Sequence, residues 1–106
     1  MTEPHRRYEV LLPMTFNDGR KVPAELIGKT LLELKEKFGP VSFETQAIRG
    51  IWPQDGETQH DELVRVFVDV LDLAENREFF VGFKQRLKER FQQEDIWITT
   101  HAVEVL

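Results

Sequence analysis

The chain has 106 residues, a formal net charge of −5 and no cysteine. This length fits one domain, and without cysteine there is no disulfide, thiolate nucleophile or cysteine-ligated metal centre. An acidic chain lacks the cationic surface that supplies most nucleic-acid affinity, and no apolar stretch approaches the roughly 18 residues of a membrane span. The first residues also lack the apolar region of a signal peptide. We therefore expect a cytoplasmic single domain, 1–106, with a flexible tail at 1–6 and no nucleic-acid or membrane partner.

The first half of the chain reads as a strand, a helix and a strand. The first strand is expected at 8–13. The first helix starts near Pro23, a favourable first helical residue, and ends before Gly39-Pro40. Its apolar residues recur at the spacing of one helix face and are Ile27, Leu31, Leu34 and Phe38. The second strand is expected from Val41 to about Trp52, and the polar connection at 53–62 is either a loop or an extended hairpin tip.

The second half repeats the order of strand, helix and strand. Strict alternation of valine predicts a strand at 63–71. Asp72 is expected to cap the second helix, with Glu75 completing a capping-box pattern. The apolar face of that helix consists of Phe80, Phe83, Leu87 and Phe91. The last strand is expected at 96–106.

This order predicts an α+β fold, a ferredoxin-like βαββαβ sandwich in which two helices cover one face of a four-stranded antiparallel sheet. The helix-covered face should carry the alternating valines together with Tyr8, Val10, Leu12, Val41, Phe43, Thr45 and Ala47. The opposite face should carry Glu9, Leu11, Glu44, Ile48, Leu63, Arg65, Phe67, Asp69 and Leu71. Because this fold hosts many unrelated functions, the sequence predicts no particular activity.

The uncovered sheet face predicts self-association. Leu11, Phe67 and Leu71 would form an exposed apolar patch, and pairing two such faces about a two-fold axis is the common way to bury one. We therefore expect a homo-oligomer, with a dimer favoured. The alternative is that segment 53–62 or the N-terminal tail covers the patch. Glu9 and Arg65 lie on neighbouring strands and could pair.

Several other residues are candidates for a site. Glu9, Arg65 and Asp69 form either an ion-pair network or, once buried, an acid–base group. Trp52 and Trp97 are either the walls of a small-molecule pocket or packing residues. His101 could join residues 60–62 only if the last strand brings it near, and adjacent side chains on an extended chain point different ways, so neither metal nor cofactor is expected. The basic run of helix two, Lys84 to Arg90, is either an anion site or a solvated face.

Three segments carry a resemblance to a known family. They are the strand at 8–12 before Asp18-Gly19, Gly50-Ile51-Trp52 before Asp55-Gly56, and 84–94 before the last strand. Together they resemble an uncharacterised family of small bacterial ferredoxin-like domains, and this resemblance implies no activity. At the level of fold, the chain is also similar to dimeric α+β barrel proteins such as the antibiotic-biosynthesis-type and haem-degrading monooxygenases. Those proteins hold a ligand between sheet and helices, but none of their functional motifs is found here.

Three hypotheses follow for an otherwise unknown function. The first is a self-associating domain with a binding or structural role and no recognisable catalytic motif. The alternative is a small cofactor-poor enzyme of the oxygenase or isomerase type that acts on an apolar metabolite. Its pocket would be lined by Trp52, Trp97, Arg65, Glu9 and His101. The third is anion or nucleic-acid binding through helix two.

Overall fold

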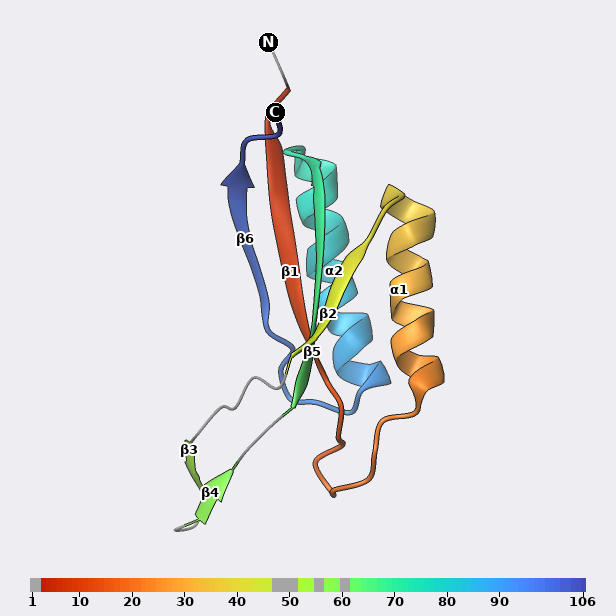
Figure 1. Ribbon diagram of the computed structural model, residues 1–106, viewed down its shortest axis with the longest axis vertical. Helices are drawn as coiled ribbons and strands as arrows, with labels where there is room; N and C mark the ends of the chain where they lie inside the picture. The colour runs from red at the N-terminus through yellow and green to blue at the C-terminus, as the bar shows by residue number, and fades with distance from the viewer. Residues whose placement is uncertain (1–2, 47–51, 55–56, 60–61) are drawn as a thin grey trace.

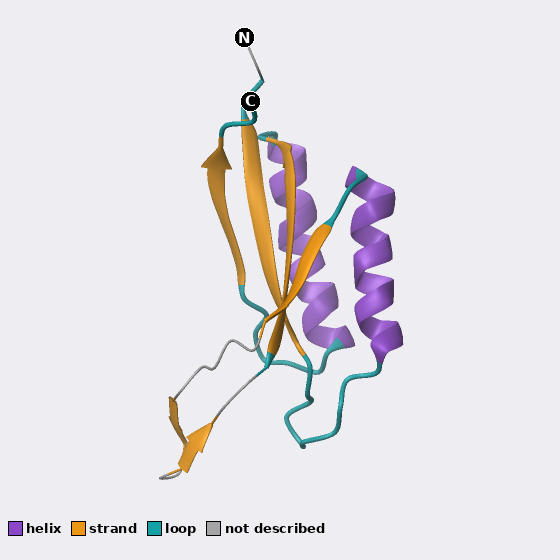
Figure 2. Ribbon diagram, viewed as in Figure 1, coloured by secondary structure: helices purple, strands orange, loops and turns teal. Residues whose placement is uncertain are grey.

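The computed structural model describes residues 3–46, 52–54, 57–59 and 62–106. Its elements are β1 (His5–Pro13), α1 (Ala24–Phe38), β2 (Ser42–Gln46), β3 (Trp52–Gln54), β4 (Glu57–Gln59), β5 (Leu63–Leu71), α2 (Ala74–Arg90) and β6 (Ile98–Val103). Four strands form an antiparallel sheet in the order β2-β5-β1-β6, while β3 and β4 form a separate hairpin. Both helices lie on one side of the sheet, and the hairpin extends away from one end of it (Figures 1 and 2). The expected α+β class, with two helices beside an antiparallel sheet, is confirmed. Neither described helix has the length and apolar composition needed to cross a membrane.

Alternation along β1 and β5 places the core between the sheet and the helices. Tyr8, Val10 and Leu12 are buried on β1, as are the four alternating valines of β5. The expected apolar face of α2 is also buried and consists of Phe80, Phe83, Leu87 and Phe91. The helix-covered face is therefore the one that the period of two predicts. The side chains of Phe43, Thr45 and Ala47, assigned to the same face, lie outside the described residues.

Both helices end in a residue with a left-handed backbone. Gly39 follows α1 with a φ of 91°, and its N–H donates to the Lys35 carbonyl over 2.8 Å. After α2 the same role falls to Gln92, with a φ of 54°. Its N–H donates to the Glu89 carbonyl and the N–H of Gln93 donates to the Lys88 carbonyl, at 3.2 and 2.9 Å. This pair of bonds is a Schellman motif, so α2 has a defined end even though no glycine follows it.

The boundary between β5 and α2 differs from the expected capping box. Leu73 occupies the N-cap position and makes no side-chain capping bond. The Asp72 carboxylate instead accepts a hydrogen bond from Arg6 Nε at 3.2 Å, and the Asp72 N–H donates to the Pro4 carbonyl at 2.9 Å. Asp72 therefore ties the start of β1 to the end of β5, and its expected role as N-cap is wrong.

Several strand limits also differ from the expected ones. β1 begins at His5, so residues 5 and 6 belong to the sheet rather than to a flexible tail. β2 ends at Gln46, the expected continuation over 47–51 lies outside the described residues, and Trp52 belongs to the hairpin strand β3. β6 covers only 98–103 of the expected 96–106.

A polar clamp joins the two helices. Thr30, fully buried on α1, donates to the Leu26 carbonyl at 2.8 Å and accepts from Arg90 Nη1 at 3.0 Å. Arg90 Nη2 and Arg86 Nη2 bind the two carboxylate oxygens of Glu33 at 2.5 and 3.2 Å. Burial acts to raise the pKa of Glu33, but the hydrogen bonds from Arg90 and Arg86 outweigh it, so the pKa is lowered. The clamp therefore holds a carboxylate in its charged form between the helices.

Candidate functional site on the open sheet face

The sheet face opposite the helices, called the open face below, collects most of the candidate residues. Strand pairing sets Leu11 opposite Arg65, and Arg65 opposite Glu44. The Leu11 N–H donates to the Trp97 carbonyl at 3.0 Å, which continues this row on the far side of β1. In the next row along the strands Glu9 lies opposite Phe67, and in the row after that Arg7 lies between His101 and Asp69. We define the open face by Arg7, Glu9, Leu11, Glu44, Arg65, Phe67, Asp69, Leu71, Trp97 and His101.

Arg65 is held by carboxylates on both neighbouring strands. Its Nη2 and Nε donate to the two oxygens of Glu9 at 2.5 and 3.3 Å, and its Nη1 donates to Glu44 Oε1 at 3.3 Å. The Arg65 and Glu9 side chains are only 22% and 21% exposed. The expected pairing of Glu9 with Arg65 is confirmed, and it fixes the guanidinium in the middle of the sheet face.

A second ion pair lies one row further along the sheet. Arg7 Nε and Nη2 donate to the two oxygens of Asp69 at 2.7 and 2.9 Å, a bidentate geometry. The hydrogen bond from Arg7 is the largest cause that lowers the pKa of Asp69, and the charges of His5 and His101 act in the same direction. Asp69 therefore pairs with Arg7 rather than sharing the Glu9–Arg65 pair. Arg7 was missed because the strand was expected to begin after it, although its alternation with Glu9 and Leu11 was a usable signal.

Phe67 lies between these two ion pairs. The guanidinium carbons of Arg7 and Arg65 are 4.6 and 4.7 Å from the centre of its ring. Both are within cation–π distance, so the ring helps to fix both guanidiniums. The two guanidiniums stand against the carboxylates of Glu9, Glu44 and Asp69.

Trp97 adds an aromatic surface at the edge of this charged group. Ile96 before it is buried and Ile98 after it packs against the core, so Trp97 points to the opposite side, where it is 63% exposed. It adjoins Leu11, one of the expected apolar anchors, and His101 lies exposed two rows along. The side chain of Trp52 lies outside the described residues, so a pocket walled by both tryptophans stays a prediction.

The other candidate positions are the histidine and acidic residues and the cations of helix two. Among the described residues no cluster of three histidine or acidic side chains has a geometry suited to a metal ion, and residues 60 and 61 fall outside them. Most cations of helix two already serve in ion pairs within the chain. Lys84 binds Asp95 at 3.0 Å, and Arg86 and Arg90 bind Glu33.

The space between sheet and helices is filled by aromatic and aliphatic side chains. Phe83, Leu87 and Phe91 are fully buried there, and Tyr8 stacks on Phe80 with 4.0 Å between ring centres. A barrel-type monooxygenase would need room for its ligand in this layer. The described side chains fill the middle of this layer, and the hollow that remains at its edge beside α1, lined in part by Met14, Ile27 and Val64, is mostly apolar. The charged and aromatic groups of the open face make that face the better candidate for ligand chemistry.

Comparison with known proteins gives structural similarity only. No protein-family model and no curated protein sequence matches the chain. The fold is similar to that of a phage SAM lyase in complex with S-methyl-5'-thioadenosine, with a TM-score of 0.68 and 15% identity over 99% of this chain and 93% of that chain. A phage SAM lyase in the apo state gives a TM-score of 0.59 and 17% identity over the same shares of the two chains. The similarity therefore covers nearly the whole of both chains.

Proposed function

We propose that this chain is a small enzyme that binds an adenosyl sulfonium compound on its open face and cleaves its carbon–sulfur bond. The observation that carries the proposal is the row of the open face in which Trp97, Leu11 and Arg65 lie on successive strands, with Glu9 bound to Arg65. It offers a flat aromatic surface at one end and a fixed guanidinium with its carboxylate at the other. The similarity in fold to a SAM lyase over 99% of the chain supplies the substrate class.

The chemistry of the open face suits such a substrate. An adenine ring can stack on the exposed indole of Trp97, as bases stack on aromatic side chains. S-adenosylmethionine carries a sulfonium, an ammonium and one carboxylate, and the carboxylates of Glu9 and Glu44 would attract its two positive groups. Three of the five N–H groups of Arg65 already donate to Glu9 and Glu44, which leaves one on Nη1 and one on Nη2 for a substrate carboxylate.

Two reaction routes would cleave this carbon–sulfur bond without a cofactor. In both, the bond between sulfur and the amino-acid side chain breaks, its electron pair passes to sulfur, and neutral S-methyl-5'-thioadenosine leaves. The remaining fragment either closes on its own carboxylate to form a lactone or loses a proton to a base. Glu9 and Glu44 are the carboxylates beside Arg65 that such a base would come from. The second product distinguishes the two routes.

Self-association belongs to the same proposal. The strand order β2-β5-β1-β6 supports a ferredoxin-like sandwich. Its uncovered face here carries Leu11 beside Trp97, with Phe67 and Leu71 further along β5. A second copy seated near this face would exclude water from the substrate and strengthen its charge interactions. The expected homo-oligomer and its cytoplasmic location are therefore retained as proposals.

The decisive experiment is to incubate the protein with S-adenosylmethionine and quantify S-methyl-5'-thioadenosine by chromatography. We expect product above the rate of the protein-free control, and a loss of at least about tenfold in Glu9→Gln, because a charged partner of Arg65 is removed. Trp97→Ala should weaken S-methyl-5'-thioadenosine binding, measured by calorimetry, by roughly tenfold or more.

The control is Glu36→Gln, which removes an exposed carboxylate of α1 and should leave both rate and binding unchanged. If S-adenosylmethionine stays intact and its thioether product does not bind, the proposed activity is wrong. In that case the open face is left with the self-association role alone.

A further inference from the structure

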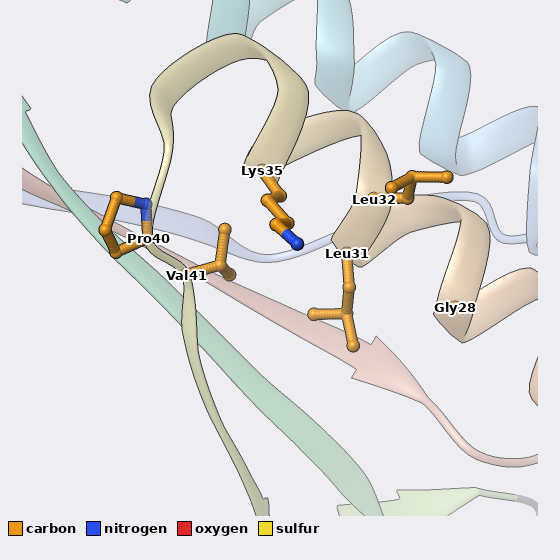
Figure 3. A pocket seen from close by; sticks show the side chains of 6 residues that line it. All are labelled: Gly28, Leu31, Leu32, Lys35, Pro40 and Val41. Atoms are coloured by element: carbon orange, nitrogen blue, oxygen red, sulfur yellow. The ribbon is translucent and has the colours of Figure 1, made fainter.

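A second, separate hollow lies beside α1. A groove of about 470 Å³ runs between α1 and the segment that leads to β2, and its lining is mostly apolar. It is formed by Gly28, Leu31, Leu32, Lys35, Pro40 and Val41 (Figure 3). A neighbouring hollow of about 350 Å³, lined in part by Met14, Ile27 and Val64, shares Gly28 and Leu31 with it. The two hollows therefore adjoin along α1, and we call them together the trough. None of the residues that define the open face lines it.

Gly28 stands where the two hollows meet. A glycine inside a helix costs about 0.5–1 kcal/mol relative to alanine. A Cβ atom at this position would meet nothing within 4 Å, so no close packing within the described chain requires glycine. Its effect is to leave the trough open at the point where a side chain would narrow it.

Lys35 gives the trough its one cationic group. Its side chain runs from α1 across the groove and its nitrogen lies between Val41 and Leu31 (Figure 3). Among the described residues this ammonium has no ion pair. An apolar trough with a single cation at one end complements a molecule with an apolar body and one anionic head.

We propose that the trough binds an amphipathic monocarboxylate, with its carboxylate at Lys35 and its apolar chain lying along Gly28 towards Ala24. The helix rises about 16 Å between Ala24 and Lys35, at about 1.5 Å per residue, which is long enough for an extended aliphatic chain. The volume of the groove lies within the range of about 300–1,000 Å³ that is usual for small-molecule sites. The proposal does not depend on the lyase activity.

The experiment is titration with sodium decanoate, followed by amide chemical shifts that locate the site. We expect saturable shifts at Gly28, Leu32 and Lys35. Lys35→Met keeps the aliphatic stem and should weaken binding roughly tenfold, since a charge-assisted hydrogen bond is lost. Lys29→Met, on an exposed position of the same helix, is the matched control and should bind as the wild type does.

Gly28→Leu tests the trough itself. Because a helix interior favours leucine over glycine, this variant should fold and unfold at no lower temperature than the wild type, yet lose decanoate binding. Equal affinity for decanol and decanoate, or equal affinity of Lys35→Met and the wild type, would overturn the carboxylate assignment. A change of molar mass in Gly28→Leu would also overturn the proposal, because it would make a second copy of the chain the occupant of the trough. Binding to phosphatidylcholine vesicles without binding of free decanoate would overturn it as well.

Discussion

Phe67 is an apolar residue of the open face that packs against charged side chains. Its ring lies under two guanidiniums, and each guanidinium is in turn fixed by a carboxylate on a neighbouring strand. An apolar side chain in this setting need not be covered by other apolar groups, because the arginines pack on it while keeping their charge hydrated. Phe67 can therefore lie on this face without an apolar cover.

The ion pair between Arg7 and Asp69 predicts an acid-sensitive contribution to stability. Because the pKa of Asp69 is lowered in the folded chain, its stabilisation is complete above the unfolded-state value of about 3.9 and is lost as the pH falls through the lower folded value. In a double-mutant cycle of Arg7→Met and Asp69→Asn, we expect a coupling of about 0.5–1 kcal/mol at pH 7, typical of a partly exposed pair.

The measurement is urea unfolding of the four proteins of the cycle at pH 7 and near pH 2. The coupling should be smaller at the lower pH, because protonation of Asp69 removes the charge that Arg7 binds. A coupling that keeps its size in acid would mean that the two side chains interact through packing rather than charge.

At the level of single residues, sequence reasoning found the alternation but not every partner. The Glu9–Arg65 pair follows from a period of two and from neighbouring strands, both of which the sequence supplies. Only the strand register of the structure places Arg7 and Trp97 on the open face, because the start of β1 and the alignment of β6 depend on contacts distant in the chain. Asp72 shows the same limit, since its competing partner, Arg6, lies 66 residues away.

The two helices depend on a clamp that their sequence patterns do not reveal. Glu33 accepts from two arginines of α2, and Arg90 is only 11% exposed. Replacing Glu33 by glutamine leaves the Arg90 charge largely buried with a weaker partner. We expect Glu33→Gln to lower the free energy of unfolding by about 1–2 kcal/mol, less than a fully buried pair would lose, because Glu33 is partly exposed.

Equilibrium unfolding in urea tests this, with Glu36→Gln as the control. Glu36 is exposed on the same helix, and its replacement should change stability by less than about 0.5 kcal/mol. Equal small losses in the two variants would show that the helices are held by their apolar faces alone.

At the level of elements, the sequence predicts the features that depend on the local spacing of apolar residues. It does not predict element ends and pairings that tertiary contacts determine. The apolar faces of both helices and the alternation of β5 were read correctly, because spacing along the chain determines them. The sequence offers no glycine at the end of α2, whereas in the structure Gln92 supplies the left-handed residue. The hairpin of β3 and β4 was one of two readings of the polar segment, since turn residues alone do not distinguish a loop from a short pairing.

The molecule as a whole presents one packed layer and one sheet face that no described helix covers (Figure 2). If that face mediates self-association, the wild type should have a molar mass at a small multiple of 12.5 kDa in light scattering after size exclusion, and Phe67→Asp should give the monomer mass. The variant should still fold, because the guanidiniums of Arg7 and Arg65 can neutralise the new carboxylate. Val81→Asp, at an exposed apolar position on α2, is the matched control and should leave the mass unchanged. A wild-type mass of 12.5 kDa would assign the open face to ligand binding within a single chain. An oligomer mass that stays unchanged in Phe67→Asp would place the interface elsewhere on the molecule.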